Sequence, residues 1–282
     1  MKIKIVTQTG SNFPLDEAER LGITVLPDIL IFDGVEYKNV YELTAEEFYE
    51  KLKTVDKLPT SSYPHVSDFV DTFVELSKDA DEIIFFAVTS KMSGSYSAAL
   101  TASEMAREAG AQCPIYVYDT LQVSHPMRLM IYEAYRLAEA GLSATEIIGK
   151  MEEYRHKMGC YFILGSLKYA KMGGRVGVIK ALAADAMGIK PLMVFDDGVV
   201  KDIGIARNMD DGIDKVIAKY KEEADFSQPV IVIHEAAPNV AATLESKIKA
   251  VNPDAQITID YEGPVVGMYA GPGGGGIAFV KK

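Results

Sequence analysis

The chain contains 282 residues, of which 48% are hydrophobic, and its formal net charge is -11 at pH 7. This length exceeds the usual ~100–200 residues of one domain, so we expect two domains. An acidic protein repels phosphate backbones and anionic lipid surfaces, which disfavours nucleic acid and stable membrane association. The two cysteines are too few for a disulfide framework and lack metal-ligand spacing, so no metal site is expected.

The first ten residues alternate like a short strand and do not show a charged segment followed by an apolar one, as a signal peptide would. The longest strongly apolar run, Ile83 to Val88, is far shorter than the ~20 residues that a membrane span needs. These features predict a cytoplasmic protein.

Short β-rich runs alternate with helical patterns through the first half of the chain. Strands are expected at Lys2–Thr7, Ile23–Phe32, Glu82–Thr89 and Ile115–Tyr118. Helices are expected at Thr44–Lys53, Val66–Lys78, Ser95–Glu108, Pro126–Ala140 and Ser143–Lys157. Thr44 with Glu47, and Ser143 with Glu146, have the spacing of a capping box. Alternation with continuous apolar strands predicts a parallel sheet covered by helices on both faces.

The second half has a different pattern. Apolar runs flank Asp196-Asp197-Gly198, and Asp-Gly in that setting is a strong hairpin signal. Further strands are expected at Tyr161–Leu164, Val230–His234, Gln256–Tyr261 and Ile277–Val280, with helices within 168–190 and near 210–223 and 240–250. We therefore predict a two-domain α/β protein: an N-terminal parallel sheet flanked by helices in residues 1–158, and a mixed sheet packed on helices in residues 159–282.

The turn from Ser90 to Ala99 follows a buried strand and opens a helix. Ligands of parallel sheets collect beyond the carboxyl ends of the strands, and free N–H groups at a helix N-terminus suit an anion. Ser93 adds a hydroxyl donor, and Gly94 permits close approach to the backbone. The alternative interpretation is that Ser93 only caps the helix.

A second polar segment, Leu58–Pro64, carries three successive hydroxyls, on Thr60, Ser61 and Ser62, between two prolines. These hydroxyls are suited to donate to a carboxylate or phosphate. The alternative is a helix-capping loop, since Pro64 fits the first turn of the following helix.

Enzyme signatures are mostly missing from the sequence. Gly271, Gly273 and Gly276 form a G-x-G-x-x-G pattern, but a strand is expected after it where dinucleotide binding requires a helix, so we reject that function. There is no G-x-S-x-G elbow, Walker A loop or H-E-x-x-H, and none of the four histidines stands at metal spacing beside a carboxylate.

Taken in order, six segments of the chain resemble the DegV family. They are Leu58–Pro64, Met92–Ala99, Val117–Thr120, Met172–Gly177, Gly188–Leu192, and Gly263–Gly267 with Gly271–Gly273. The resemblance covers essentially the whole chain. It implies a two-domain α/β fold with a long-chain fatty acid buried between the domains, and, in members that serve a fatty-acid kinase system, presentation of the acid to a separate kinase.

The resemblance also assigns residues. The carboxylate-binding hydroxyls fall on Ser61 and Ser93, with Gly94 supplying backbone, and Thr60 and Ser62 flank the first of them. The family's C-terminal histidine is replaced by Tyr269, which can still donate a hydrogen bond. The Gly-Gly-Arg turn places Arg175 as a candidate for partner contact, or as a structural arginine. No catalytic residue and no cofactor are implied.

The chain departs from the family pattern in two further places. The usual N-terminal stretch with two acids appears as Gln8-Thr9-Gly10-Ser11-Asn12, so amides replace the acids. The usual serine and spaced glycines after Asp119 appear as Ser124-His125-Pro126-Met127-Arg128. Two alternatives to a fatty-acid carrier therefore stay open: a binding protein for another amphiphilic acid or lipid, and a serine-dependent hydrolase using Ser93 or Ser61, for which the sequence names no base.

Overall fold

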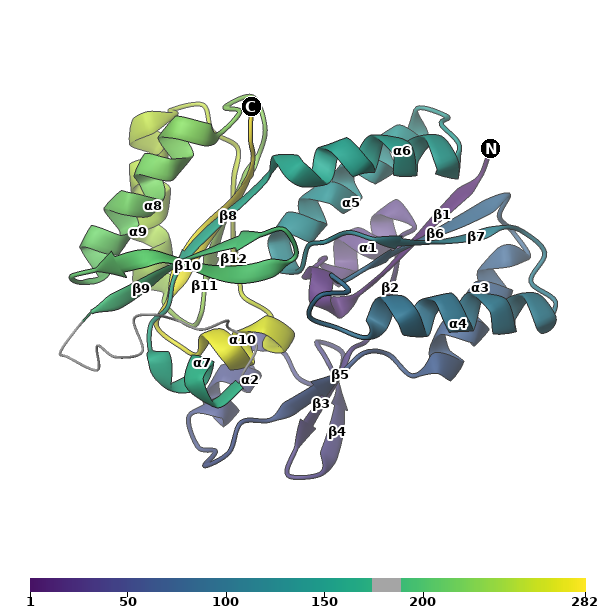
Figure 1. Cartoon of the computed structure of the whole chain (residues 1–282), viewed down its shortest axis with the longest axis horizontal. Helices are drawn as coiled ribbons and strands as arrows, with labels where there is room; N and C mark the ends of the chain where they lie inside the picture. The colour runs from purple at the N-terminus through teal and green to yellow at the C-terminus, as the bar shows by residue number, and fades with distance from the viewer. Residues whose placement is uncertain (174–188) are drawn as a thin grey trace. The chain divides into compact units, whose positions relative to one another are not determined.

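The computed structural model describes residues 1–173 and 189–282 (Figure 1). This part of the chain forms two compact units. Unit 1 comprises Met1–Tyr41 and Ser61–His156, and unit 2 comprises Glu42–Thr60 and Lys157–Lys282. The short segment Glu42–Thr60 thus groups with the C-terminal half of the chain. The two-domain division near residue 158 stays a prediction.

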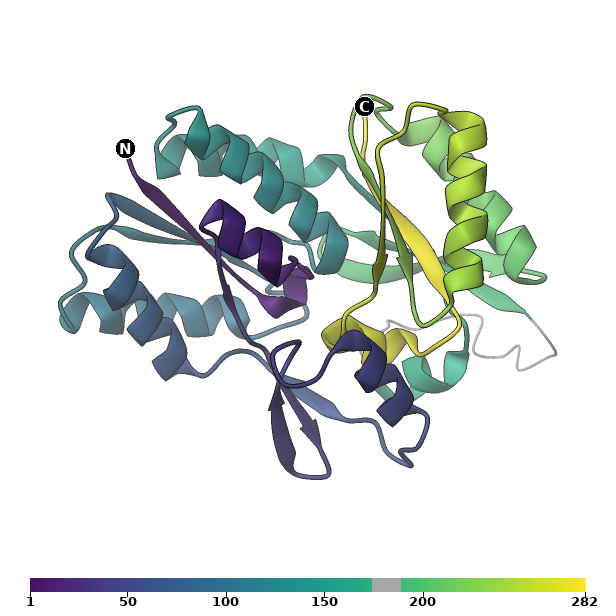
Figure 2. The ribbon, with the colours of Figure 1, turned by 180° about the vertical axis from the view of Figure 1, so that it is seen from behind.

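A four-stranded parallel sheet forms the centre of unit 1. Its order is β2-β1-β6-β7, with β1 at Ile3–Gln8, β2 at Thr24–Leu26, β6 at Glu82–Ala87 and β7 at Ile115–Asp119. Helices α3 (Val66–Ser77) and α4 (Ser95–Glu108) pack on one face, where Phe69, Phe73 and Ala99 meet Phe85. Helices α1 (Leu15–Leu21), α5 (Ser124–Glu139) and α6 (Ala144–Tyr154) cover the other face (Figures 1 and 2). The predicted parallel sheet with helices on both faces is confirmed.

A separate three-stranded sheet has the order β4-β3-β5, with β3 at Ile29–Phe32, β4 at Val35–Lys38 and β5 at Thr60–Ser62. The prediction of one strand at Ile23–Phe32 is wrong, because β2 and β3 belong to different sheets. Pro27 lies between them, and proline has no N–H to donate to a strand ladder. The prediction of a loop at Leu58–Pro64 missed the short strand β5.

Unit 2 contains a six-stranded mixed sheet of order β10-β9-β8-β13-β11-β12. The strands are β8 at Met158–Ile163, β9 at Lys190–Asp196, β10 at Val199–Ala206, β11 at Val230–His234, β12 at Ile257–Tyr261 and β13 at Gly275–Val280. Only β11 and β12 are parallel among its pairs; the others are antiparallel. Helices α8 (Met209–Glu223) and α9 (Pro238–Val251) bury Val216 and Leu244 against Ile277.

The opposite face of this sheet meets short helices. Ala170 of α7 (Leu167–Gly173) and Ala270 of α10 (Pro264–Ala270) cluster with Met193 of β9, and α10 also contacts α2 (Ala45–Leu52). The predicted mixed sheet packed on helices is confirmed. The helix α10 is not among the helices predicted from the sequence.

Several local predictions are confirmed in their details. Thr44 and Ser143 both form capping boxes, at the starts of α2 and α6. The β9–β10 hairpin turns at Asp197 and Gly198, whose φ angles of 49° and 77° are the positive values that a tight hairpin turn requires. The strand β13 occupies the end of the glycine run and the residues after it, as predicted for Ile277–Val280. The described residues also include two single-turn 3-10 helices, η1 (Thr9–Ser11) and η2 (Arg155–Lys157).

Candidate ligand-binding site

The loop between β6 and α4 begins beyond the carboxyl end of a central strand of unit 1. The N–H groups of Met92 and Ser93 both donate to the Thr89 carbonyl, at 3.2 and 3.1 Å, which folds the loop into a tight turn. Gly94 is exposed and precedes the first residue of α4. The predicted turn at a helix N-terminus is therefore present.

Ser93 is half-buried, and its Oγ accepts a hydrogen bond from the Ser95 N–H at 3.2 Å. This contact has the geometry of a local serine turn, so part of the capping interpretation holds. Within residues 1–173 and 189–282, no acceptor is found for the Ser93 hydroxyl proton. A serine hydroxyl can donate one hydrogen bond while it accepts another. Ser93 can therefore cap the helix and still donate to a ligand.

Tyr63 brings the second polar segment beside this turn. A Cβ added to Gly94 would lie 3.0 Å from Cε1 of the Tyr63 ring, so the ring packs directly against the glycine. Tyr63 follows β5, in which Ser61 is half-buried while Thr60 and Ser62 are exposed. Successive side chains of a strand point to opposite faces. Ser61 thus lies on the face opposite Thr60 and Ser62, and the three hydroxyls do not converge.

A buried carboxylate lies beneath the turn. Asp28 is 2% exposed, and its carboxylate accepts three hydrogen bonds: from Gln8 Nε2 at 2.6 Å, Thr9 Oγ1 at 2.9 Å and the Gly10 N–H at 2.6 Å. Burial raises the pKa of Asp28 from 3.8 to about 6, and the hydrogen bonds oppose that rise. Sequence reasoning missed Asp28, because its only local signal is an acid directly after Pro27 at the end of an apolar run.

The departures from the family pattern contact one another. Asn12 Nδ2 donates to Ser124 Oγ at 3.0 Å, and Arg128 Nη1 donates to the Asn12 carbonyl at 3.3 Å. Ser124 Oγ lies 2.8 Å from His125 Nδ1, and Ser124, His125 and Arg128 are all buried. Asn12 and Ser124 both have positive φ angles, 51° and 59°. These substitutions thus form one internal cluster that joins the loop after β1 to the start of α5.

Two of the predicted residues belong to the C-terminal half. Tyr269 is half-buried in α10, a helix that begins with Pro264 and ends at Gly271, whose φ is 70°. Arg175 and its preceding Gly174 lie outside the described residues, so the prediction of partner contact stays a prediction.

Unit 2 also buries acidic groups that the sequence did not reveal. Glu235 is 3% exposed, and its Oε2 has no hydrogen-bond partner among the described residues. Burial, and next the charge of Glu262, raise the pKa of Glu235 well above its usual value. A Cβ added to Gly274 would lie 2.7 Å from Glu235 Oε2, so the glycine run is needed partly to make room for this side chain.

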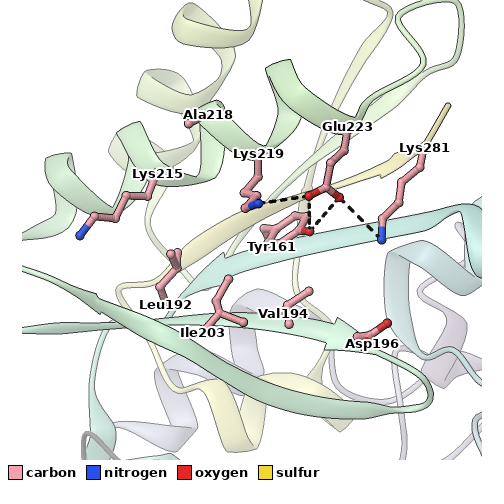
Figure 3. Close-up of a pocket in the computed structure, with 10 residues that line it drawn as sticks. All are labelled: Tyr161, Leu192, Val194, Asp196, Ile203, Lys215, Ala218, Lys219, Glu223 and Lys281. Carbon is pink, nitrogen blue, oxygen red and sulfur yellow. Dashed lines mark hydrogen bonds and ion pairs between the residues drawn. The ribbon is translucent and has the colours of Figure 1, made fainter.

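An open pocket of about 640 Å³ lies in unit 2 between α8 and the β9–β10 hairpin (Figure 3). Its apolar floor includes Leu192, Val194 and Ile203, and Tyr161 donates to Glu223 at its centre, at 2.8 and 2.9 Å to the two oxygens. Lys219 and Lys281 also pair with Glu223. The charged groups around the pocket thus neutralise one another. None of the ligand-binding residues predicted from the sequence lines this pocket.

The part of the chain in view shows no group of three or more His, Cys, Asp or Glu side chains arranged to hold a metal ion. Nor does any helix in that part have the length and apolar character needed to cross a membrane. Asp119, which follows β7, accepts hydrogen bonds from the N–H groups of Ser90 and Leu121, each at 3.1 Å. It therefore holds two loops together.

Comparison with known proteins identifies relatives over the full length. The family model described as "Uncharacterised protein, DegV family" matches residues 2–282. A DegV domain-containing protein from Halalkalibacterium halodurans is 31% identical over 285 residues, which cover 100% of this chain and 99% of the relative.

Solved structures match the fold over the same length. Bacillus subtilis DegV, described as a fatty acid binding protein, has a TM-score of 0.88 at 27% identity and covers 100% of both chains. A stearic acid-binding protein from Eubacterium ventriosum has a TM-score of 0.88 at 25% identity, with 99% of this chain and 98% of that chain covered. These matches confirm the predicted fold class.

Proposed function

The chain belongs to the DegV family, and from that premise we propose that it binds a long-chain fatty acid whose carboxylate is held by Ser93. The observation that carries the proposal is the Ser93 hydroxyl, whose oxygen is occupied by the Ser95 N–H and whose proton has no acceptor among the described residues. It stands at the N-terminus of a 14-residue helix, where the helix dipole favours an anion. The names of the two solved neighbours, a fatty acid binding protein and a stearic acid-binding protein, support a fatty acid as that anion.

The other proposed head-group contacts come from Ser61 of β5 and from the backbone of the Ser93 turn. Ser61 donates its hydroxyl, and the backbone at Gly94 approaches the ligand closely because the glycine has no side chain. Thr60, Ser62 and Tyr269 contribute less, since the first two are exposed on the other face of β5. The location of the acid between two domains stays a prediction.

The acyl chain dominates the affinity. Each buried CH₂ contributes roughly 0.8 kcal/mol, so a dozen methylenes supply on the order of 10 kcal/mol before the costs of binding. A hydrogen bond to the charged head group adds about 1.5–3 kcal/mol. Ser93 therefore sets orientation and selects a carboxylate over a neutral head group.

Mass spectrometry of the purified protein, native and then denatured with organic extraction, tests the ligand directly. We expect a non-covalent adduct that releases a fatty acid. An adduct of a lysolipid or isoprenoid acid would redirect the proposal to that class of amphiphile. Absence of any adduct, together with no uptake of added stearate, would refute fatty-acid binding.

Substitutions test the head-group assignment. We expect Ser93→Ala to weaken fatty-acid binding by about ten- to a hundredfold, the loss of one charge-assisted hydrogen bond, and Tyr269→Phe to weaken it less. A displacement titration against a fluorescent fatty acid measures both. Equal losses from the two variants, or no loss from Ser93→Ala, would contradict the assignment.

The protein acts as a carrier and is not itself an enzyme in this proposal. A nucleophilic serine needs a positioned base. Among the described residues, the hydrogen-bond partner of Ser93 Oγ is the Ser95 N–H, which is not a base. Phosphorylation of the bound acid would fall to a separate kinase. A serine-reactive probe that labels Ser93 in the intact protein would favour the hydrolase instead.

A further inference from the structure

A chain of buried hydrogen bonds leads from Asp28 to the Ser93 turn. Gln8 is 1% exposed, and its amide lies between the Asp28 carboxylate and Ser95, the first residue of α4. Its Nε2 donates to Asp28 Oδ1 at 2.6 Å. Its Oε1 accepts from the Ser95 hydroxyl and, at 3.5 Å, from the Val88 N–H.

These partners fix the orientation of the amide. An ionised carboxylate can only accept, so the NH₂ group of Gln8 must face Asp28. A backbone N–H can only donate, so the oxygen must face Val88 and the neighbouring Ser95 hydroxyl. Ser95 is completely buried, and water cannot substitute for Gln8 as its acceptor.

Ser95 passes this constraint to the binding turn. While its hydroxyl is held by Gln8, its backbone N–H donates to Ser93 Oγ at 3.2 Å. That contact occupies the Ser93 oxygen and directs the hydroxyl proton away from α4. The Ser93 turn at the N-terminus of α4 is thus linked, through Ser95 and Gln8, to the Asp28 carboxylate. Asp28 in turn accepts hydrogen bonds from Thr9 and Gly10, in the loop after β1.

We propose that Gln8 is a positioning residue, which couples the buried Asp28 carboxylate to Ser95 and thereby holds the Ser93 hydroxyl in its donating orientation. The proposal rests on the proposed function for the identity of the anion that Ser93 receives. It assigns a role to a residue that touches no ligand. It also explains why an amide side chain suits position 8. A methionine of similar length could not donate to Asp28 and would be only a weak acceptor for Ser95.

A double-mutant cycle of Gln8→Met and Ser95→Ala tests the coupling. We expect each single variant to weaken stearate binding by about tenfold, because the Ser93 hydroxyl is then no longer held in its donating orientation before the ligand binds. The double variant should be weakened by about tenfold as well, since both changes break the same chain. Losses that multiply to about a hundredfold would mean that the two residues act independently, and would overturn the proposal.

Amide hydrogen exchange, measured without ligand, separates this proposal from the proposed function. We expect Gln8→Met to accelerate exchange in the first turn of α4, at residues 95–98, and to leave α8 unchanged. The matched control is Ser103→Ala, which removes another buried hydroxyl of α4 that donates only to the Leu100 carbonyl, at 2.7 Å. It should change neither exchange at the first turn nor binding.

The two failures look different. Wild-type protein that does not bind stearate refutes the proposed function, while faster exchange at residues 95–98 in Gln8→Met still supports the positioning role. Unchanged exchange at those residues in both Gln8→Met and Ser95→Ala refutes the positioning role, whatever the wild-type affinity is.

Gln8→Glu adds a pH profile that a general packing role would not produce. Two carboxylates at hydrogen-bond distance cannot both ionise, so the variant needs a shared proton to reproduce the amide's contacts. Among the described residues, the groups that hydrogen-bond to the Gln8 or Asp28 side chain belong to Thr9, Gly10, Val88 and Ser95, and Asn39 donates in turn to Thr9; none of these five residues has a titrating side chain. We expect the binding deficit of Gln8→Glu relative to wild type to shrink as pH falls from 8 to 5 by more than that of Gln8→Met, whose pH dependence reflects only the titration of Asp28 in the wild type. A pH-independent deficit in Gln8→Glu would contradict the hydrogen-bonded coupling.

Discussion

The two units each bury a carboxylate, and they treat it differently. In unit 1, Asp28 is surrounded by three donors, and its pKa rises only to about 6. In unit 2, Glu235 leaves one oxygen without a partner in the described structure, and the charge of Glu262 adds to the effect of burial, so its pKa rises well above 4.5. Similar burial therefore raises the two pKa values to different extents, because hydrogen bonds to the ionised form decide how much charge an interior tolerates.

The largest effect is expected from removing the acceptor in unit 1. Asp28→Ala leaves the Gln8 amide, the Thr9 hydroxyl and the Gly10 N–H buried without their acceptor, at about 1–3 kcal/mol each. We expect a loss of about 3–5 kcal/mol in the free energy of unfolding at pH 7, measured by urea denaturation. Asp71→Ala, an exposed aspartate of α3, is the control and should change stability by less than about 0.5 kcal/mol. A loss as small as that of the control would show that the three donors find other acceptors.

A matched pair of glycines compares the space beside each carboxylate. A Cβ at position 274 would lie 2.4 Å from the Ile163 carbonyl oxygen, which is backbone and cannot easily shift. A Cβ at position 10 would meet side chains, Val88 Cγ2 at 2.9 Å and Asp28 Oδ2 at 3.3 Å. We therefore expect Gly274→Ala to destabilise the protein by about 3 kcal/mol and Gly10→Ala by about 1–2 kcal/mol. Thermal unfolding of both variants checks the order, and a reversed order would contradict it.

Glu235→Gln should flatten the pH dependence of stability. The folded state holds the Glu235 proton more tightly than the unfolded state, so stability falls as pH rises above about 4.5 and continues to fall up to the folded pKa. One such group contributes about 1.4 kcal/mol per pH unit. Denaturation at pH 5, 6, 7 and 8 should show a shallower decline for Glu235→Gln than for wild type. The control is Glu46→Gln, at an exposed position of α2, which should leave the pH-dependent decline in stability as it is in wild type. If Glu235→Gln also left that decline as it is in wild type, Glu235 would have to be ionised in the folded protein.

Asp28→Asn should produce a smaller effect in a narrower window. Its folded pKa of about 6 exceeds the ordinary 3.8, so the contribution of Asp28 to wild-type stability falls as pH rises from about 4 to 6 and is constant above that. The variant should lack this contribution, which amounts to about 3 kcal/mol across the window. A difference that persists with the same slope above pH 7 would assign it to another group.

The parts of the fold that follow from local chemistry could be predicted. The capping residues Thr44 and Ser143 and the Asp197-Gly198 turn act within four residues of themselves, and the structure confirms them. The helix α10 was missed although its signals were present, with Pro264 at the first position and Gly271 after the last.

The polar network beneath the candidate site could not be predicted in the same way. Gln8 bonds to Asp28 and to Ser95, which lie 20 and 87 residues away in the sequence. No periodicity or spacing reports such contacts, because they arise only when separate strands and a helix meet at one end of the sheet. The candidate turn at Ser93, by contrast, was visible because its strand, glycine and helix are contiguous.

The assignment of residues 42–60 to unit 2 affects the order in which the nascent chain can fold. Tyr49 is 1% exposed, and its hydroxyl donates to the Glu262 carbonyl at 3.0 Å, 213 residues later. During synthesis at ~5–20 residues per second, this segment waits for its partners for on the order of ten seconds or more. Phe48, Tyr49 and Leu52 stay exposed during that time, which makes this segment a candidate contact for chaperones until the C-terminal half emerges.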